Sequence, residues 1–165
     1  MCDEYIEAAE HGYRFLKEKM WDTDNGAFYW EVDATGNEKL KPRKHLYGQS
    51  FALYAISEYF LATGRQDVLD FAIRFFGLLE EKSHDKMYGG YIEFFNEDWT
   101  PVPAGESSYM GAPADSLTKV WWVEAEAVVS ALYMHRFSGD PQYLDIFQQT
   151  YDYIEKQLVD FEHGE

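Results

Sequence analysis

The sequence predicts a mainly helical protein of the α/α-toroid type, an (α/α)6-barrel architecture of which about five helices and short β-hairpins are present. Two observations predict this fold. Amphipathic helices alternate with helices that are apolar on nearly every side, and a unit of helix and hairpin recurs along the chain. In two concentric rings, the amphipathic helices form the outer layer and the apolar helices the inner one. We expect residues 1–165 to form one partial domain of this kind.

The recurring unit is visible when the sequence is shifted by 75 residues, with a second register at 63 residues. The matched positions are mostly turn and small core residues: Gly64 with Gly139, Ala52 with Ala127, Asp85 with Asp160, and, at the shorter shift, Asp22 with Asp85 and Gly26 with Gly89. These are positions at which backbone geometry or close packing demands the residue type. We therefore interpret the register as a structural repeat.

Hydrophobic periodicity places each element. We expect helices over 4–20, 44–62, 67–83, 117–137 and 141–159, and short strands over 28–32 and 91–95. Helices 67–83 and 141–159 each carry one apolar stripe, whereas 44–62 and 117–137 are apolar over most of their circumference. Gly64 and Gly139 are typical helix stops, and Pro141 behind Asp140 is a typical helix start.

Segment 103–116 interrupts this pattern and is expected to be a linker or a deletion junction. Residues 101–116 hold three of the five prolines in the chain. Five helices are too few to close a ring, so we expect an open inner face or two open edges. The chain is therefore expected either to form a homo-oligomer or to be part of a longer protein.

Composition excludes several classes of function. The net charge of −16 disfavours binding to nucleic acid, and no apolar run reaches the ~20 residues that a membrane span needs. A single cysteine, Cys2, and an acidic start without a signal-peptide pattern favour the cytoplasm. No metal-binding motif and no phosphate-binding loop occurs, so we expect no cofactor.

Aromatic residues make up 18% of the chain, which suits a thick core, a stacking surface for sugars, or both. Tyr47 and Trp122 coincide in the 75-residue register, each near the start of an apolar helix. At that position they either stack on a sugar ring in a central cavity or pack in the core. Trp121 is the neighbouring candidate, and the sequence does not decide which of the two indoles faces inward.

Three polar residues are further candidates for sugar binding. Gln49 and Glu124 coincide in the 75-residue register and either bind sugar hydroxyls or hydrogen-bond nearby backbone. His45 follows two cationic residues at a helix start and fits either a neutral base or, as we prefer, a histidine that orients a neighbour. The residues alone name no catalytic group.

Several runs of residues resemble the N-acylglucosamine 2-epimerase and cellobiose 2-epimerase family. They are Lys-His-Leu-Tyr-Gly-Gln-Ser-Phe-Ala over 44–52, Asp85 with Tyr-Gly-Gly-Tyr over 88–91, Asp-Trp-Thr-Pro over 98–101, Lys-Val-Trp-Trp over 119–122 with Glu-Ala-Glu-Ala over 124–127, and Asp160 with His-Gly-Glu over 163–165. The resemblance covers most of residues 5–102 and 117–165, in the order expected of the family.

The resemblance implies an (α/α)6 toroid and epimerisation at C2, or aldose–ketose isomerisation, of a free reducing mono- or disaccharide. It implies a pair of histidines that act as general acid and base through an enediolate, because a proton leaves one face of C2 and returns to the other. Family members are much longer, and the hairpins that hold those two histidines have no counterpart here. The chain is therefore expected to be a truncated or internally deleted isomerase without the catalytic pair.

Two other functions stay open. One is a non-catalytic helical-repeat remnant that binds sugar or assembles through its open edges. The other is a glycoside hydrolase or lyase on the same scaffold, since one fold supports many chemistries.

Overall fold

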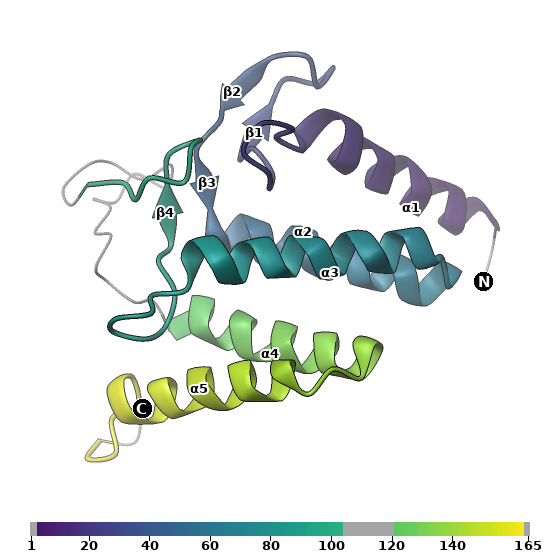
Figure 1. Ribbon diagram of the computed structural model, residues 1–165. Helices are drawn as coiled ribbons and strands as arrows, with labels where there is room; N and C mark the ends of the chain where they lie inside the picture. Colours follow the sequence, from purple (N-terminus) through teal and green to yellow (C-terminus); the bar gives the residue numbers. More distant parts are fainter. Residues whose placement is uncertain (1–2, 104–120, 164–165) are drawn as a thin grey trace.

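A computed structural model describes residues 3–103 and 121–163, and shows two inner helices that carry outer helices on their flanks (Figure 1). The inner helices are α2 (Leu46–Thr63) and α4 (Trp121–Ser138), which pack side by side. The outer helices are α1 (Asp3–Phe15), α3 (Gln66–Ser83) and α5 (Gln142–Gln157). Helices α1 and α3 pack on α2, and α5 packs on α4. The predicted alternation of inner and outer helices is confirmed.

The helix boundaries differ from the prediction in two places. The first helix ends in a π-helical turn, η1 (Leu16–Met20), rather than in α-helix. Helix α2 begins at Leu46 and not at residue 44, because Lys44 and His45 are extended and pair with a strand of the next hairpin. Residues 117–120 of the predicted fourth helix and residues 104–116 of the predicted linker lie outside the described part of the chain.

The strands are shorter than predicted and more numerous. Strand β1 (Glu31–Val32) pairs with β2 (Lys39–Lys41), and β3 (Lys44–His45) pairs with β4 (Phe94–Phe95), both antiparallel. The pattern over 28–32 and 91–95 therefore marks the right segments, but only their last residues form strands, and their first residues, Phe28 and Tyr91, pair as isolated bridges with Trp21 and His84. Strands β2 and β3 were not predicted, because short charged segments such as Lys39–Lys41 carry no strand pattern.

The repeat is confirmed in detail by the loops that precede the hairpins. Asp22 accepts hydrogen bonds at Oδ1 from the backbone of residues 24 and 25, and Asp85 Oδ1 accepts them from residues 87 and 88. Gly26 and Gly89 then donate their N–H to the carbonyl of the same aspartate, each at a positive φ (+76° and +78°). Asp160 Oδ1 likewise accepts hydrogen bonds from the backbone of residues 162 and 163, so the spacing reports one recurring loop geometry.

The core lies between α2 and the outer helices. Phe71 and Phe75 of α3 meet Phe28 and Trp21 edge-to-face, and on the other side Phe76 meets Tyr143 of α5. Helix α3 is therefore buried more widely than its predicted single stripe. The glycine stops are confirmed, since Gly64 and Gly139 end α2 and α4 at positive φ.

The inner helices are covered on only part of their circumference. Exposed large apolar residues on them are Phe51, Tyr54 and Leu61 of α2 and Trp121, Val129 and Leu132 of α4. An open inner face is the predicted consequence of an incomplete ring. None of the helices in the described ranges combines the length and apolar character of a membrane span.

Candidate functional site: an aromatic platform at the start of the inner helices

Tyr47, Phe51 and Trp122 form an aromatic platform across the N-terminal ends of α2 and α4. The Tyr47 and Trp122 rings stack with centroids 4.5 Å apart and planes at 26°, and Phe51 meets Tyr47 edge-on at 4.7 Å. Tyr47 and Trp122 are half-buried and Phe51 is 51% exposed. The two residues that coincide in the repeat register therefore touch each other in space.

Trp121 is the indole that faces outward. Its side chain is 70% exposed, whereas Trp122 lies against Tyr47 and its Nε1 is buried without a hydrogen-bond partner among the described groups. The two neighbouring indoles point in different directions because residues one apart on a helix are about 100° apart. An exposed ring beside a stacked pair offers flat apolar faces of the kind that sugar rings contact.

His45 lies next to Tyr47 of the platform and is fully buried. Its Nε2 is 2.9 Å from Glu93 Oε1, and its ring stacks on Phe94 at 4.3 Å and lies 4.7 Å from Trp30. Tyr47 is its neighbour at 5.8 Å. This placement fits the preferred interpretation, a histidine that orients its neighbours.

The start of α2 is held by a buried ion pair. Lys44 Nζ donates to Asp22 Oδ2 at 2.8 Å, and neither side chain is exposed. Burial would raise the pKa of Asp22, but hydrogen bonds from Lys44 and Asn25 outweigh it and hold the pKa at about 2. Burial lowers the pKa of Lys44, although Asp22 opposes this. The pair ties the first aspartate loop to the residues directly before Tyr47.

Gln49 and Glu124 hold the inner helices to the hairpins. Gln49 accepts a hydrogen bond from Phe28 N–H at 2.9 Å and donates one to Phe28 C=O at 2.8 Å, while Glu124 accepts one from Tyr91 N–H at 2.8 Å. Both side chains are buried. These contacts realise the backbone-bonding alternative, and binding of sugar by either residue stays a prediction.

Sequence reasoning missed Trp30, Glu93 and Phe94 as parts of the site. Trp30 packs on His45 and also lies against α2 at Gly48. A Cβ at position 48 would come within 2.9 Å of the Trp30 ring, so the contact between Trp30 and α2 requires glycine there. The signal that could have located the Trp30 contact is the glycine at position 48, inside an otherwise apolar helix.

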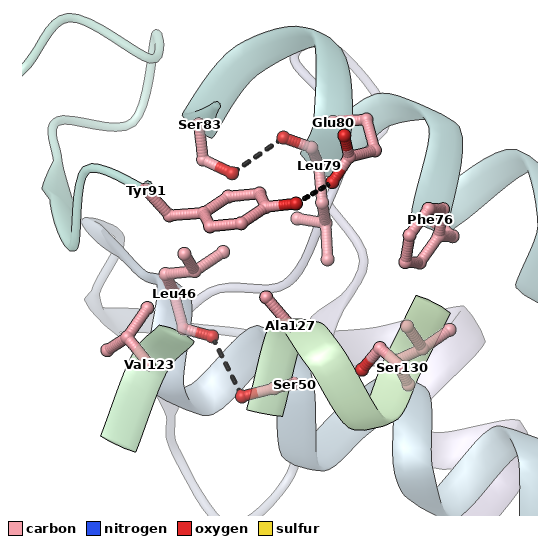
Figure 2. Close-up of a pocket in the computed structure, with 11 residues that line it drawn as sticks. Leu46, Ser50, Phe76, Leu79, Glu80, Ser83, Tyr91, Val123, Ala127 and Ser130 are labelled. Atoms are coloured by element: carbon pink, nitrogen blue, oxygen red, sulfur yellow. Dashed lines mark hydrogen bonds between the residues drawn. The ribbon is translucent and has the colours of Figure 1, made fainter. Parts of the chain in front are cut away.

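A small cavity between α2, α3 and α4 is not a sugar site. Its volume is about 30 Å³, and its lining includes Ser83, Tyr91, Ala127 and the carboxyl group of Glu80 (Figure 2). That volume holds about one water molecule. Tyr91 donates its hydroxyl hydrogen to Glu80, and burial raises the pKa of both groups.

The described part of the chain has the features of an α/α-toroid protein. These are inner helices that alternate with outer ones, aspartate–glycine loops before the hairpins, and an aromatic platform where the inner helices begin. The family profile of N-acylglucosamine 2-epimerase (GlcNAc 2-epimerase) matches residues 2–114 and 108–165. The chain belongs to this family.

Two epimerases and one hydrolase illustrate the likeness. The cellobiose 2-epimerase of Dictyoglomus turgidum is 43% identical over 99 residues, which cover 60% of this chain and 25% of that protein. The structure of cellobiose 2-epimerase from Bacillus thermoamylovorans B4167 superposes with a TM-score of 0.85 at 28% identity, over 98% of this chain and 40% of that one. A family 76 glycoside hydrolase (mannosidase) from Bacteroides thetaiotaomicron shares the fold, with a TM-score of 0.70 at 21% identity over 93% and 38% of the two chains. The chain thus spans between a quarter and two fifths of the length of these relatives.

Proposed function

We propose that the chain carries the aromatic wall of a carbohydrate 2-epimerase or isomerase site, which acts at C2 of a free reducing mono- or disaccharide through an enediolate. The observation that carries this proposal is the platform of Tyr47, Phe51 and Trp122 with exposed Trp121 beside it. Membership of a family with cellobiose and N-acylglucosamine epimerases supports the same substrate class.

In this proposal the platform orients the sugar and a proton moves at C2. A stacked aromatic ring covers one face of a pyranose and leaves the other open to an acid–base group. His45 supports Tyr47 and takes no part in proton transfer, because it is buried and bound to Glu93.

A second candidate function is sugar binding without catalysis. The positions of the histidines favour it, because an acid–base mechanism of this type needs two histidine side chains that face the sugar. His84 lies by Glu80, His135 Nδ1 lies 3.0 Å from Asp140 O, and His163 lies by Asp160, so each is engaged away from the platform. A hydrolase has only the shared fold in its favour.

One experiment separates these functions. The chain is incubated in deuterated water with cellobiose, mannose and N-acetylmannosamine, and loss of the C2 proton signal is followed by NMR. Binding is measured in parallel by tryptophan fluorescence for the wild type and for Tyr47→Ala, with Tyr88→Ala, an exposed tyrosine on a hairpin loop, as the matched control.

Exchange at C2 that Tyr47→Ala reduces at least ~10-fold supports the isomerase. Binding without exchange selects the second candidate, and release of free sugar units from cellobiose selects the hydrolase. If none of the three sugars binds or exchanges, the proposal is wrong for this chain.

A further inference from the structure

A polar cavity lies between α5 and the loop of residues 84–90, and it shares no residue with the aromatic platform. Its volume is about 230 Å³, and it is lined by residues 84–86, 89 and 90 of the loop and by Gln149 and Thr150 of α5. Thr150 is buried, whereas Gln149 and Lys86 are exposed, so the cavity opens to solvent beside the last two. At ~30 Å³ per water molecule, it has room for about eight waters. It is therefore large enough for a small organic ligand.

The repeat relates this cavity to a second place in the fold. The first aspartate–glycine loop packs on α3 as the second one, residues 84–90, packs on α5. A Cβ at Gly26 would lie 2.6 Å from Leu78 of α3, and a Cβ at Gly89 would lie 2.9 Å from Tyr153 of α5. In the sequence, Gly89 follows Gly26 by 63 residues and Tyr153 follows Leu78 by 75, which are the two shifts of the repeat. The two interfaces are therefore equivalent and can be compared residue by residue.

Aromatic rings fill the first of these interfaces. Phe75 of α3 is fully buried, and its ring centroid lies 5.5 Å from that of Trp21 and 5.0 Å from that of Phe28. By the same two shifts, Trp21, Phe28 and Phe75 correspond in the second interface to His84, Tyr91 and Thr150. In each set, the first two residues form an antiparallel bridge.

The cavity occupies space that these replacements leave. An imidazole stands where the first interface has an indole, and a threonine stands where it has a phenylalanine. Both of these smaller residues, His84 and Thr150, line the cavity. Loss of buried aromatic volume costs stability, because protein interiors are otherwise close-packed. Departures from close packing of this kind are typical of functional sites. The second repeat unit thus has a polar cavity where the first has an apolar core.

The polar groups of the lining are held in place and have hydrogen-bonding capacity left. His84 Nδ1 lies 3.6 Å from Glu80 Oε2, and the imidazole stacks on the Tyr91 ring with centroids 5.2 Å apart. Among the described residues, none is bound to His84 Nε2, on the other side of the ring. Thr150 adds a hydroxyl that also hydrogen-bonds Tyr91, and Gln149 adds an amide. A ligand in the cavity can therefore meet an imidazole, a hydroxyl and an amide.

The charges of the lining favour a neutral ligand. Asp85 and Lys86 carry opposite charges, and the chain as a whole carries −16, which repels anions. The described part of the chain contains no group of three or more His, Cys, Asp or Glu side chains suited to a metal ion. Imidazole, hydroxyl and amide groups both donate and accept hydrogen bonds, as the hydroxyl groups of a sugar do.

We propose that the cavity between α5 and the loop of residues 84–90 is a second carbohydrate site, which binds one neutral sugar ring through His84, Gln149 and Thr150. The ring lies in the cavity with its hydroxyl groups on these three side chains. Further units of a longer saccharide extend past Lys86 and Gln149 into solvent. Binding at this site requires no free reducing end, because no bond of the sugar changes there.

The test titrates the full chain with methyl β-D-glucopyranoside and follows single residues by NMR. This glucoside has no free reducing end, so it cannot undergo exchange at C2. The backbone amide signals of Gly89 and Gly90 report on the cavity, and the indole N–H signals of Trp121 and Trp122 report on the platform. We expect saturable shifts of the two glycine signals with a Kd in the millimolar range, because few contacts bind a small polar ligand.

Two variants of α5 test the assignment. Gln149→Ala should weaken binding at the cavity ~5-fold, since a hydrogen-bonding group is lost. Gln148→Ala is the matched control, because Gln148 is the neighbouring exposed glutamine and does not line the cavity, and it should bind as the wild type does. Thr150→Phe restores the residue of the first interface and should abolish the glycine shifts by filling the cavity. Circular dichroism shows whether each variant is folded, and the comparison of the two glutamine variants decides if Thr150→Phe is not.

Absence of saturable shifts at Gly89 and Gly90 in ~100 mM glucoside would overturn the proposal and leave the cavity to water. Equal binding by Gln149→Ala and Gln148→Ala would overturn it too. Saturation with sodium phosphate but not with the glucoside would show an anion site instead. The indole signals and C2 exchange of reducing sugars are measured separately, so failure of this proposal and failure of the proposed function are distinguishable.

Discussion

The buried pair of Asp22 and Lys44 makes the stability of this protein depend on pH in the acid range. The pKa of Asp22 is about 2 in the folded chain against 3.8 as the ordinary value. Because the folded pKa is the lower one, the unfolded chain takes up the proton first as pH falls. The contribution is present above pH ~4 and is lost toward pH ~2, and a shift of this size is worth about 2 kcal/mol.

We therefore expect Asp22→Asn to lose about 3 kcal/mol at pH 7, since Lys44 stays buried without its carboxylate. The same variant should show a smaller loss of stability than the wild type between pH 4 and pH 2. Urea unfolding at a series of pH values measures both. Parallel pH dependences of the two proteins would show that Asp22 is not the group responsible.

Gly90 and Ala27 occupy matching loop positions at positive φ (+68° and +64°), but their surroundings differ. A Cβ at Gly90 would lie 2.7 Å from Glu124 Oε1, the atom that accepts the Tyr91 N–H. Gly90→Ala should therefore destabilise the chain by about 2 kcal/mol, through backbone strain and a displaced Glu124. Ala27→Gly is the control and should change stability by less than ~1 kcal/mol, because relief of strain offsets the lost methyl burial. Thermal unfolding compares the two, and equal effects would contradict this account.

The positions of single residues were predictable where the same position recurs in both repeat units. Tyr47 and Trp122 were located by register alone, since equivalent positions on neighbouring inner helices meet in space. Their contact and the outward direction of Trp121 were not predictable, because a register gives equivalence and not orientation. The buried state of His45 depends on Trp30 and Phe94, which come from two different hairpins.

At the scale of elements, one side chain per unit joins an inner helix to its hairpin. Gln49 satisfies both the N–H and the C=O of Phe28 inside the protein. Gln49→Met keeps the volume but leaves two buried backbone groups without partners. We expect a loss of about 3 kcal/mol in urea unfolding. Gln66→Met, at an exposed glutamine in the first turn of α3, is the control and should cost less than ~1 kcal/mol. A similar loss in both variants would mean that the clamp contributes little.

Long elements followed from the sequence and short ones did not. The existence of every described helix was predictable, because the outer helices carry an apolar stripe and the inner helices are apolar over most of their circumference. Strands β2 and β3 are two or three residues long and owe their pairing to partners elsewhere in the chain, Lys44 with Phe95 among them. The π-helical end of α1 likewise left no pattern in the sequence.

At the scale of the whole molecule, the open ring should divide the chain into regions of different stability. Helix α3 is enclosed by α2, by the first hairpin and by α5, whereas α1 contacts α2 across a groove with a total volume near 1,000 Å³. Local opening is easiest where few apolar contacts are buried. Helix α1 is thus the element expected to open first.

Hydrogen exchange by mass spectrometry checks this expectation. Amides of residues 7–15 should exchange at least ~100-fold faster than those of residues 70–83, which are protected by the buried face of α3. Exchange at one common rate in both helices would show instead that α1 opens only with the whole fold, and that its few buried residues suffice to hold it.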